Sequence, residues 1–146
     1  MEHDRNLSLK LFIVLSRATR TISDLAHQDI QSYGLNTTEF AVLDLLYHKG
    51  EQPLQKIGEK ILIASGSITY VVDKLEEKGY LTRNPSPNDR RIIYAIITEK
   101  GKKLFDEIFP KHERKIDEIV NGLSDEEKNE AIFLLKKLGI YAKHIK

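Results

Sequence analysis

The sequence contains no cysteine. This absence excludes a disulfide scaffold, a metal site built from thiolates and a sensor that works by cysteine oxidation. The opening residues, MEHDRNLSLKLFIVL, include early acidic side chains and no apolar run long enough for a signal peptide or a membrane-spanning helix. We therefore expect a cytoplasmic protein with no membrane partner.

Enzyme motifs are also missing. The five histidines show no paired ligand spacing and no HExxH motif, so we expect no metal site. The segment Ser65-Gly66-Ser67 lacks the second glycine and the lysine of a phosphate-binding loop, and no GxSxG motif occurs. These absences predict a protein that is not an enzyme and needs no cofactor.

The net charge is small, but the charged residues are unevenly distributed along the chain. The formal net charge is +1, although 31% of the 146 residues are charged. Any affinity for nucleic acid must therefore come from local asymmetry. Residues 83–103 show it, with six basic side chains against two acids, Asp89 and Glu99.

Periodic apolar residues predict the helices of the first half. Leu11, Leu15 and Ile22 lie on one face of a helix expected over residues 7–32. A capping box at Asn36 and Glu39 predicts a second helix over residues 37–48. A short third helix is expected from residue 53 to residue 61.

The segment 65–101 predicts a helix followed by a basic hairpin. Ser65 is the expected N-cap of a helix that buries its Ile68–Val72 side and stops at Gly79. Residues 80–83 and 92–97 are β-branched and aromatic, whereas residues 84–89 favour a turn. A helix beside a basic hairpin is typical of a winged helix-turn-helix, which places the helix in the major groove of DNA.

The remaining residues predict two long terminal helices. Thr98 caps a helix that runs to about residue 121, and a capping box at Ser124 starts the last helix. The first and last helices carry more apolar surface than a small core can cover, which indicates a homodimer. We expect one mainly α domain over residues 1–146, with a small β-hairpin wing, a winged-helix core at about 36–100 and dimerisation helices at about 7–32 and 99–146.

Several motifs resemble those of one family. Asp89-Arg90-Arg91, followed after six residues by Thr98-Glu-Lys-Gly101, resembles the DxR…LTxxG signature of MarR-family regulators. The segments from Asn36 to Leu43 and from Ser65 to Thr69 are similar to that family's second helix and recognition helix. The resemblance covers the whole chain in order and implies a dimeric, ligand-responsive DNA-binding repressor or activator. Because it lacks cysteine, the chain resembles the cysteine-free, phenol- and quinone-responsive repressors of the family.

Residues of the predicted recognition helix are candidate DNA contacts. Ser65 and Ser67 can bond phosphate at the helix N-terminus, although Ser65 can also serve as a plain cap. Thr69 and Tyr70 can reach base edges, and Lys74 can reach phosphate. The alternatives are a half-buried core aromatic for Tyr70 and a solvated side chain for Lys74.

The wing supplies further candidates. By the resemblance, Arg91 enters the minor groove, and Asp89 orients it by a charge-assisted bond; the alternative is a hairpin salt bridge without DNA. Arg83 and Arg90 are expected to contact the DNA backbone. Two-fold symmetry predicts an inverted-repeat operator with half-sites about 10 bp apart.

The resemblance also implies an effector pocket where the first, second and fifth helices meet. A small phenolic or quinone-like ligand would suit an apolar slot with a few polar groups. The candidates are Phe12, Ser16, Phe40, Tyr47, Phe105 and His112. A winged-helix module that binds protein instead of DNA remains the alternative function, because fold does not fix function.

Overall fold

The computed structural model describes residues 4–61 and 65–146, apart from the side chains of residues 65 and 66. Over these ranges the chain forms six helices and three short strands, which confirms the mainly α fold with a small hairpin wing. The elements are α1 (Arg5–Gln31), α2 (Thr37–Lys49), β1 (Gln52–Pro53), α3 (Leu54–Lys60), α4 (Ser65–Glu77), β2 (Leu81–Pro85), β3 (Ile93–Ile97), α5 (Glu99–Val120) and α6 (Asp125–Lys143). None of the helices within the described ranges is both long and apolar enough to cross a membrane.

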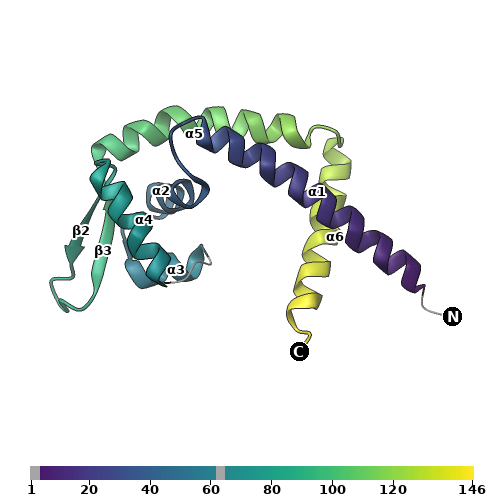
Figure 1. The fold of residues 1–146 in the computed structure, drawn as a ribbon, viewed down its shortest axis with the longest axis horizontal. Coiled ribbons are helices and arrows are strands. Elements are labelled where there is room, and N and C mark those ends of the chain that lie inside the picture. Colours follow the sequence, from purple (N-terminus) through teal and green to yellow (C-terminus); the bar gives the residue numbers. More distant parts are fainter. Residues whose placement is uncertain (1–3, 62–64) are drawn as a thin grey trace.

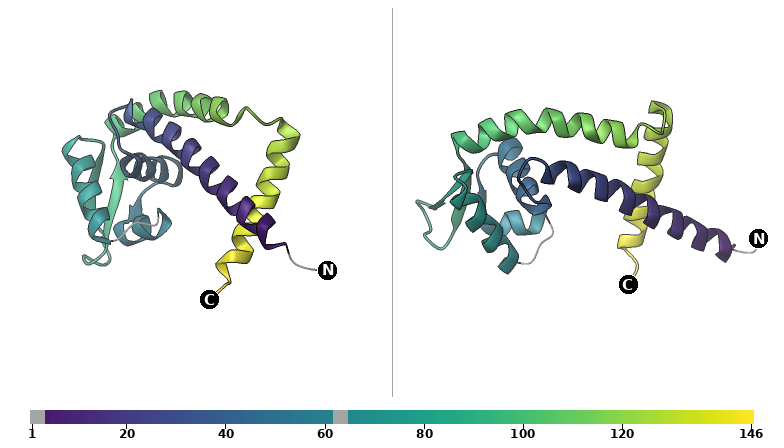
Figure 2. Two further views of the ribbon diagram at one scale, coloured as in Figure 1. Left: turned by 45° about the vertical axis from the view of Figure 1, so that its right-hand side comes forward. Right: turned by 45° about the horizontal axis from the view of Figure 1, so that its top comes forward.

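The elements form a globular body with a long helical extension (Figure 1). Helices α2, α3 and α4 and the β2–β3 hairpin make up the body. Helix α5 leaves the body, α1 packs along it, and α6 passes beside α1 at the far end. The rotated views show both termini at this far end, away from the hairpin (Figure 2).

The core lies inside the body. The apolar face expected for α4 is confirmed, because Ile68, Val71, Val72 and Leu75 are all buried. They belong to one cluster with buried side chains of α2, α3, the sheet and α5. The core therefore fixes α4 by its inner face and leaves its outer face to solvent.

Side-chain caps set the N-terminal ends of α1, α2, α5 and α6. The capping boxes of α2, at Asn36 and Glu39, and of α6, at Ser124 and Glu127, are confirmed. Thr98 caps α5 by accepting a hydrogen bond from the Gly101 amide. Helix α4 begins at Ser65, but the side chain of Ser65 and the residues 62–64 before it lie outside the described residues.

The sheet differs from expectation in two respects. It has three antiparallel strands in the order β1-β3-β2, and the two-residue β1, which pairs with Tyr94 and Ala95, was not expected. Strand β2 also extends through Asn84 and Pro85, for which the sequence predicts a turn. Proline is tolerated there because β2 is an edge strand.

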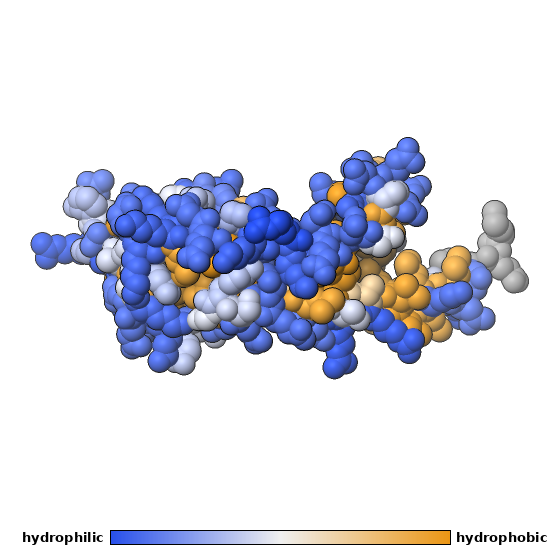
Figure 3. Space-filling model, turned by 90° about the horizontal axis from the view of Figure 1, so that it is seen from above, coloured by the Kyte–Doolittle hydropathy of each residue, from blue (hydrophilic) through white to orange (hydrophobic). Residues whose placement is uncertain are grey.

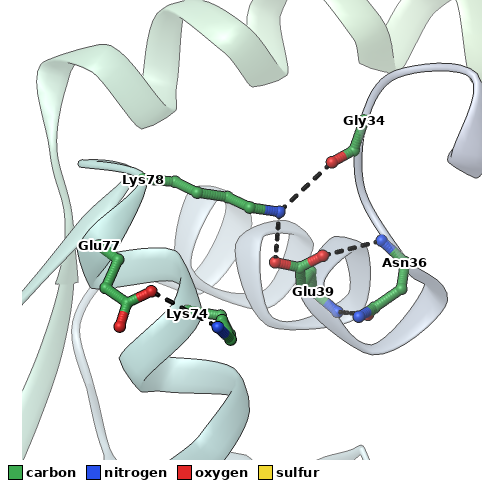
Figure 4. Close-up of polar contacts among 6 residues, drawn as sticks. All are labelled: Gly34, Asn36, Glu39, Lys74, Glu77 and Lys78. Carbon is green, nitrogen blue, oxygen red and sulfur yellow. Dashed lines mark hydrogen bonds and ion pairs between the residues drawn. The ribbon is translucent and has the colours of Figure 1, made fainter.

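A partly buried ion pair joins the end of α4 to the start of α2 (Figure 4). The Lys78 ammonium, just after α4, donates to Glu39 Oε2 at 2.8 Å and to the Gly34 carbonyl at 3.3 Å. Glu39 Oε1 accepts from the Asn36 amide at 2.9 Å, and the Glu39 side chain is only 5% exposed. The cap of α2, the α1–α2 loop and the end of α4 therefore share one polar cluster.

Apolar side chains are exposed on the extension. On α1, Leu7 and Phe12 are 64% and 68% exposed, and on α6 Phe133 and Tyr141 are 66% and 71% exposed. Leu11 of α1 and Leu138 of α6 line an open apolar groove of about 490 Å³ between the two helices. Figure 3 shows this apolar surface at the end of the molecule that carries the N-terminus.

A close backbone contact explains the glycine of the Thr98–Gly101 motif. A methyl group added at Gly101 would overlap the carbonyl oxygen of Tyr80 and press on the Ile97 side chain. The same Tyr80 carbonyl accepts from the Thr98 amide at 3.0 Å, and the Thr98 hydroxyl donates to the Gly79 carbonyl at 2.7 Å. The start of α5 is thus held against the segment between α4 and β2.

We expect Gly101→Ala to destabilise the protein, although alanine is the better helix former by about 1 kcal/mol. The methyl group must displace the Tyr80 backbone, and overpacking of this kind costs about 1–3 kcal/mol. Urea unfolding would measure the change. The exposed Lys103→Ala, two residues further along α5, is the control and should change stability by less than about 0.5 kcal/mol. A stabilised Gly101→Ala protein would contradict the close contact.

Candidate nucleic-acid interface

The outer face of α4 is polar and accessible. Ser67 and Thr69 are exposed, and Tyr70 is 62% exposed, so Tyr70 is not a core aromatic. The Lys74 ammonium lies 5.6 Å from the centre of the Tyr70 ring and 3.6 Å from Glu77 Oε2. Four of the predicted contact residues therefore lie together on one helix surface.

The tip of the wing is an ordered turn that presents Arg91. The Ser86 amide donates to the Ile92 carbonyl at 2.8 Å, which closes the hairpin. The expected contact with Asp89 is present, because Arg91 Nε and Nη2 each donate to an Asp89 carboxylate oxygen at 3.1 Å. The Arg91 side chain is nevertheless 90% exposed. Arg90 beside it is also exposed.

The Asp89–Arg91 contact is charge-assisted at both ends. The side-chain hydrogen bonds from Arg91, followed by the bond from its backbone amide, lower the pKa of Asp89 below its usual value. Asp89 is therefore ionised at neutral pH and can hold the guanidinium in one orientation. This geometry preorganises a cation at the wing tip but leaves its planar face open to a partner.

Arg83 is placed differently from the other predicted contacts. Its Nη2 lies 2.7 Å from Asp73 Oδ1 and 2.8 Å from Glu76 Oε1, both on α4. Hydrogen bonding to Glu76 raises the pKa of Arg83, burial opposes this, and Asp73 adds to it. The structure thus pairs Arg83 with the recognition helix, a contact that the sequence pattern did not predict.

The candidate effector residues do not all come together. Phe40, Tyr47, Phe105 and His112 form one aromatic cluster, in which the Phe105 ring lies 5.3 Å from Phe40 and 4.9 Å from Tyr47. Phe105 is completely buried, so it serves the core. Phe12 and Ser16, in contrast, are exposed on the N-terminal half of α1.

An open groove of about 610 Å³ lies beside this cluster. His48 and Phe109 form its aromatic wall, and Lys49, Lys60 and Asp44 are its polar groups. None of the six candidate effector residues lines the groove. The sequence does contain a pattern that favours such a groove: Asp44 and His48, and likewise Phe105 and Phe109, are four residues apart and so lie on one face of their helix.

A second polar cluster joins α1 to α5. His112 Nδ1 lies 2.8 Å from Asp29 Oδ2, which also accepts from the Tyr33 hydroxyl at 2.9 Å. The His112 ring packs on Phe40 of α2, with ring centres 4.7 Å apart. The hydrogen bonds therefore join α1 to α5 within the extension, and the ring contact with Phe40 connects this cluster to the body. Among the described residues, no group of three His, Asp or Glu side chains could hold a metal ion.

Comparison with known proteins agrees with this geometry. A model of the MarR family matches residues 35–93. The HTH-type transcriptional regulator MhqR of Bacillus subtilis is 61% identical over 136 residues, which cover 93% of this chain and 94% of MhqR. This chain belongs to the MarR family.

Solved MarR-type structures share the fold. A mutant of E. coli MarR complexed with operator DNA has a TM-score of 0.80 at 20% identity, over 94% of this chain and 99% of the other. Bordetella bronchiseptica BpsR, whose DNA binding is regulated by 6-hydroxynicotinic acid, has a TM-score of 0.78 at 25% identity, over 89% and 98%. Our MarR-family chain is a DNA-binding transcriptional regulator with a winged helix.

The junction between α1 and α5 can be tested by titration. Burial, the hydrogen bond to Asp29 and the charge of Asp29 raise the pKa of Tyr33 to about 12. We expect Asp29→Asn to lower it towards 10, because the neutral amide no longer disfavours tyrosinate. NMR titration of tyrosine-labelled protein would follow each ring.

Asp106→Asn, at a second tyrosine–aspartate pair, is the control for this titration. The hydrogen bond from the Tyr47 hydroxyl to Asp106 raises the pKa of Tyr47. Asp106→Asn should therefore lower the pKa of Tyr47 and leave that of Tyr33 in place. A Tyr33 pKa that does not respond to Asp29→Asn would contradict the junction.

Proposed function

We propose that two copies of this chain form a dimer that binds an inverted-repeat operator and represses transcription until a small aromatic ligand releases it. The observation that carries the proposal is the accessible polar face of α4 beside an exposed Arg91 held by Asp89. A helix of this kind fits the major groove, while the cationic wing reaches the minor groove, where a narrow groove concentrates negative potential. The proposal involves no catalytic activity, and contact with genomic DNA requires a cytoplasmic location.

In the proposed complex the contacts divide between phosphates and bases. Ser65, Ser67 and Lys74 bond phosphate oxygens, whereas Thr69 and Tyr70 reach base edges or thymine methyl groups. Arg91 enters the minor groove, and Arg90 lies against the backbone. Phosphate contacts position the protein, so sequence preference depends mainly on Thr69, Tyr70 and Arg91.

Exposed apolar side chains on α1 and α6 support the dimer. Soluble monomers rarely expose a continuous apolar surface of this extent. Pairing of two copies through these helices would cover it and place two α4 helices on one face. The winged-helix core at about 36–100 then binds DNA, and α1 with the region 99–146 forms the dimer.

Ligand release is supported by relatedness and by a groove. The identity with MhqR fits the cysteine-free, phenol- and quinone-responsive subgroup. The groove beside His48 and Phe109 combines aromatic walls with Lys49 and Lys60, which suits a small aromatic ring with an acidic hydroxyl. It borders α2, α3 and α5, so an occupant would contact elements that support α4.

We expect Arg91→Ala to weaken operator binding by about 1–3 kcal/mol without unfolding the dimer, because a minor-groove guanidinium is lost. A fluorescence-anisotropy titration at fixed salt would measure the loss. Arg114→Ala removes an exposed arginine of α5 about 22 Å along that helix from its start and is the control, with its dimer checked by sedimentation because Arg114 lies in the proposed dimer region. Equal affinities for wild type and Arg91→Ala would rule out the wing contact.

Calorimetry with phenolic compounds would test ligand release. We expect binding of the compound to release heat and to reduce the affinity of the protein for DNA. His48→Ala should lower the affinity for the compound by about tenfold, or about 1.4 kcal/mol. Tyr47→Phe is the control, because Tyr47 is next to His48 in sequence but does not line the groove. No heat and no release of DNA from the wild-type protein would remove this part of the proposal.

A further inference from the structure

The recognition helix carries acidic side chains where a DNA-binding surface needs cations. Residues 65–77 contain three carboxylates, Asp73, Glu76 and Glu77, and one basic side chain, Lys74. Glu77 is paired with Lys74 at 3.6 Å. Asp73 lies one turn after Tyr70 on the outer face, and its side chain is 46% exposed. Unpaired, Asp73 and Glu76 would repel the phosphates of a duplex.

Arg83 of β2 pairs with both of these carboxylates. One guanidinium nitrogen, Nη2, lies within 2.8 Å of both Asp73 Oδ1 and Glu76 Oε1. The Arg83 side chain is 29% exposed, whereas the Arg91 side chain is 90% exposed. If Nη2 turned to a phosphate instead, Arg83 would give up two charge-assisted bonds and leave two carboxylates unpaired.

The same carboxylate of Glu76 also binds the backbone of the wing. Glu76 Oε2 accepts from the Arg83 amide at 3.2 Å. Strand β2 is the edge of the sheet, so this contact ties an edge strand to a helix side chain instead of to a further strand. Side chain and backbone of Arg83 thus fix the base of the hairpin against α4.

We propose that Arg83 is a positioning residue of the DNA-binding surface and not a phosphate contact. Arg83 holds the wing at a fixed place beside the recognition helix. It also neutralises the carboxylates of Asp73 and Glu76, which lie on the side of α4 that contacts the wing. The minor-groove reach of Arg91 then depends on Arg83, because both residues belong to the same hairpin. This inference rests on the proposed DNA interface.

A double-mutant cycle on operator affinity tests the role of Arg83. Arg83→Met is made in the native background and in an Asp73→Asn/Glu76→Gln background, in full-length dimers checked by sedimentation. A positioning role predicts a loss of about tenfold in the native background and less than about threefold in the carboxamide background, because the partners of Arg83 are already neutral there. An arginine that affected only folding would lower unfolding stability and leave the affinity of folded dimers intact.

A direct phosphate contact makes the opposite prediction. Arg83→Met would then weaken binding at least as much in the carboxamide background, where the arginine is released from α4. Either that result, or a native-background Arg83→Met protein with full affinity, overturns the proposal. Arg83→Lys is a milder second variant, because it keeps the charge but cannot hold both carboxylates. It should lose affinity in the native background and not in the carboxamide background, and full affinity in the native background would again contradict the proposal.

The Arg91→Ala variant in the same titration separates two kinds of failure. If Arg91→Ala has no effect, the proposed wing contact itself is wrong. If Arg91→Ala weakens binding and Arg83→Met costs the same in both backgrounds, the wing contact stands and the positioning role of Arg83 is wrong.

Discussion

The ion pair between Lys78 and the buried Glu39 carboxylate is the contact on which the placement of α4 depends. A buried carboxylate is costly unless it is paired and hydrogen-bonded, and Glu39 has both Lys78 and the Asn36 amide. Because Lys78 also binds the Gly34 carbonyl, the end of α4 is fixed to the loop that joins α1 to α2. The core holds the inner face of α4, and this polar cluster sets where its C-terminal end lies.

Two other polar contacts extend the same arrangement outwards. Arg83 links the outer side of α4 to the wing, and the Asp29–His112 pair links α1 to α5. The first joins two consecutive elements through partly exposed side chains, whereas the second joins helices 83 residues apart through side chains with little exposure to water. The apolar core alone would hold these elements together, but directional bonds are needed to set their relative orientation.

Local sequence signals predicted most of the fold. The caps at Asn36, Thr98 and Ser124 and the stop at Gly79 are short-range features that fix helix ends wherever the rest of the chain lies. Strand β1 could not be predicted in this way, because two residues carry no periodicity and their pairing with β3 is set by tertiary structure.

The site was predicted less completely, for the same reason. Arg91 and Asp89 are two residues apart, so their contact follows from the local sequence. The partners of Arg83 lie seven and ten residues away on another element, and nothing in the basic pattern of residues 83–103 distinguishes Arg83 from Arg91. The groove at His48 and Phe109 likewise forms between helices that are distant in sequence. Phe105, which the sequence predicts as a ligand contact, is completely buried in the core and does not line this groove.

The length of α1 has a mechanical consequence. Its 27 residues correspond to a rod of about 40 Å. One end of the rod carries the exposed apolar side chains, and the other end, at Ile30, is anchored in the core of the body. A tilt of about 5° at the apolar end would shift the anchored end by roughly 3.5 Å, about the spacing of neighbouring base pairs. In the proposed dimer the helix would therefore act as a lever, so that a small change in how two copies of α1 cross would be magnified at the end anchored in the body.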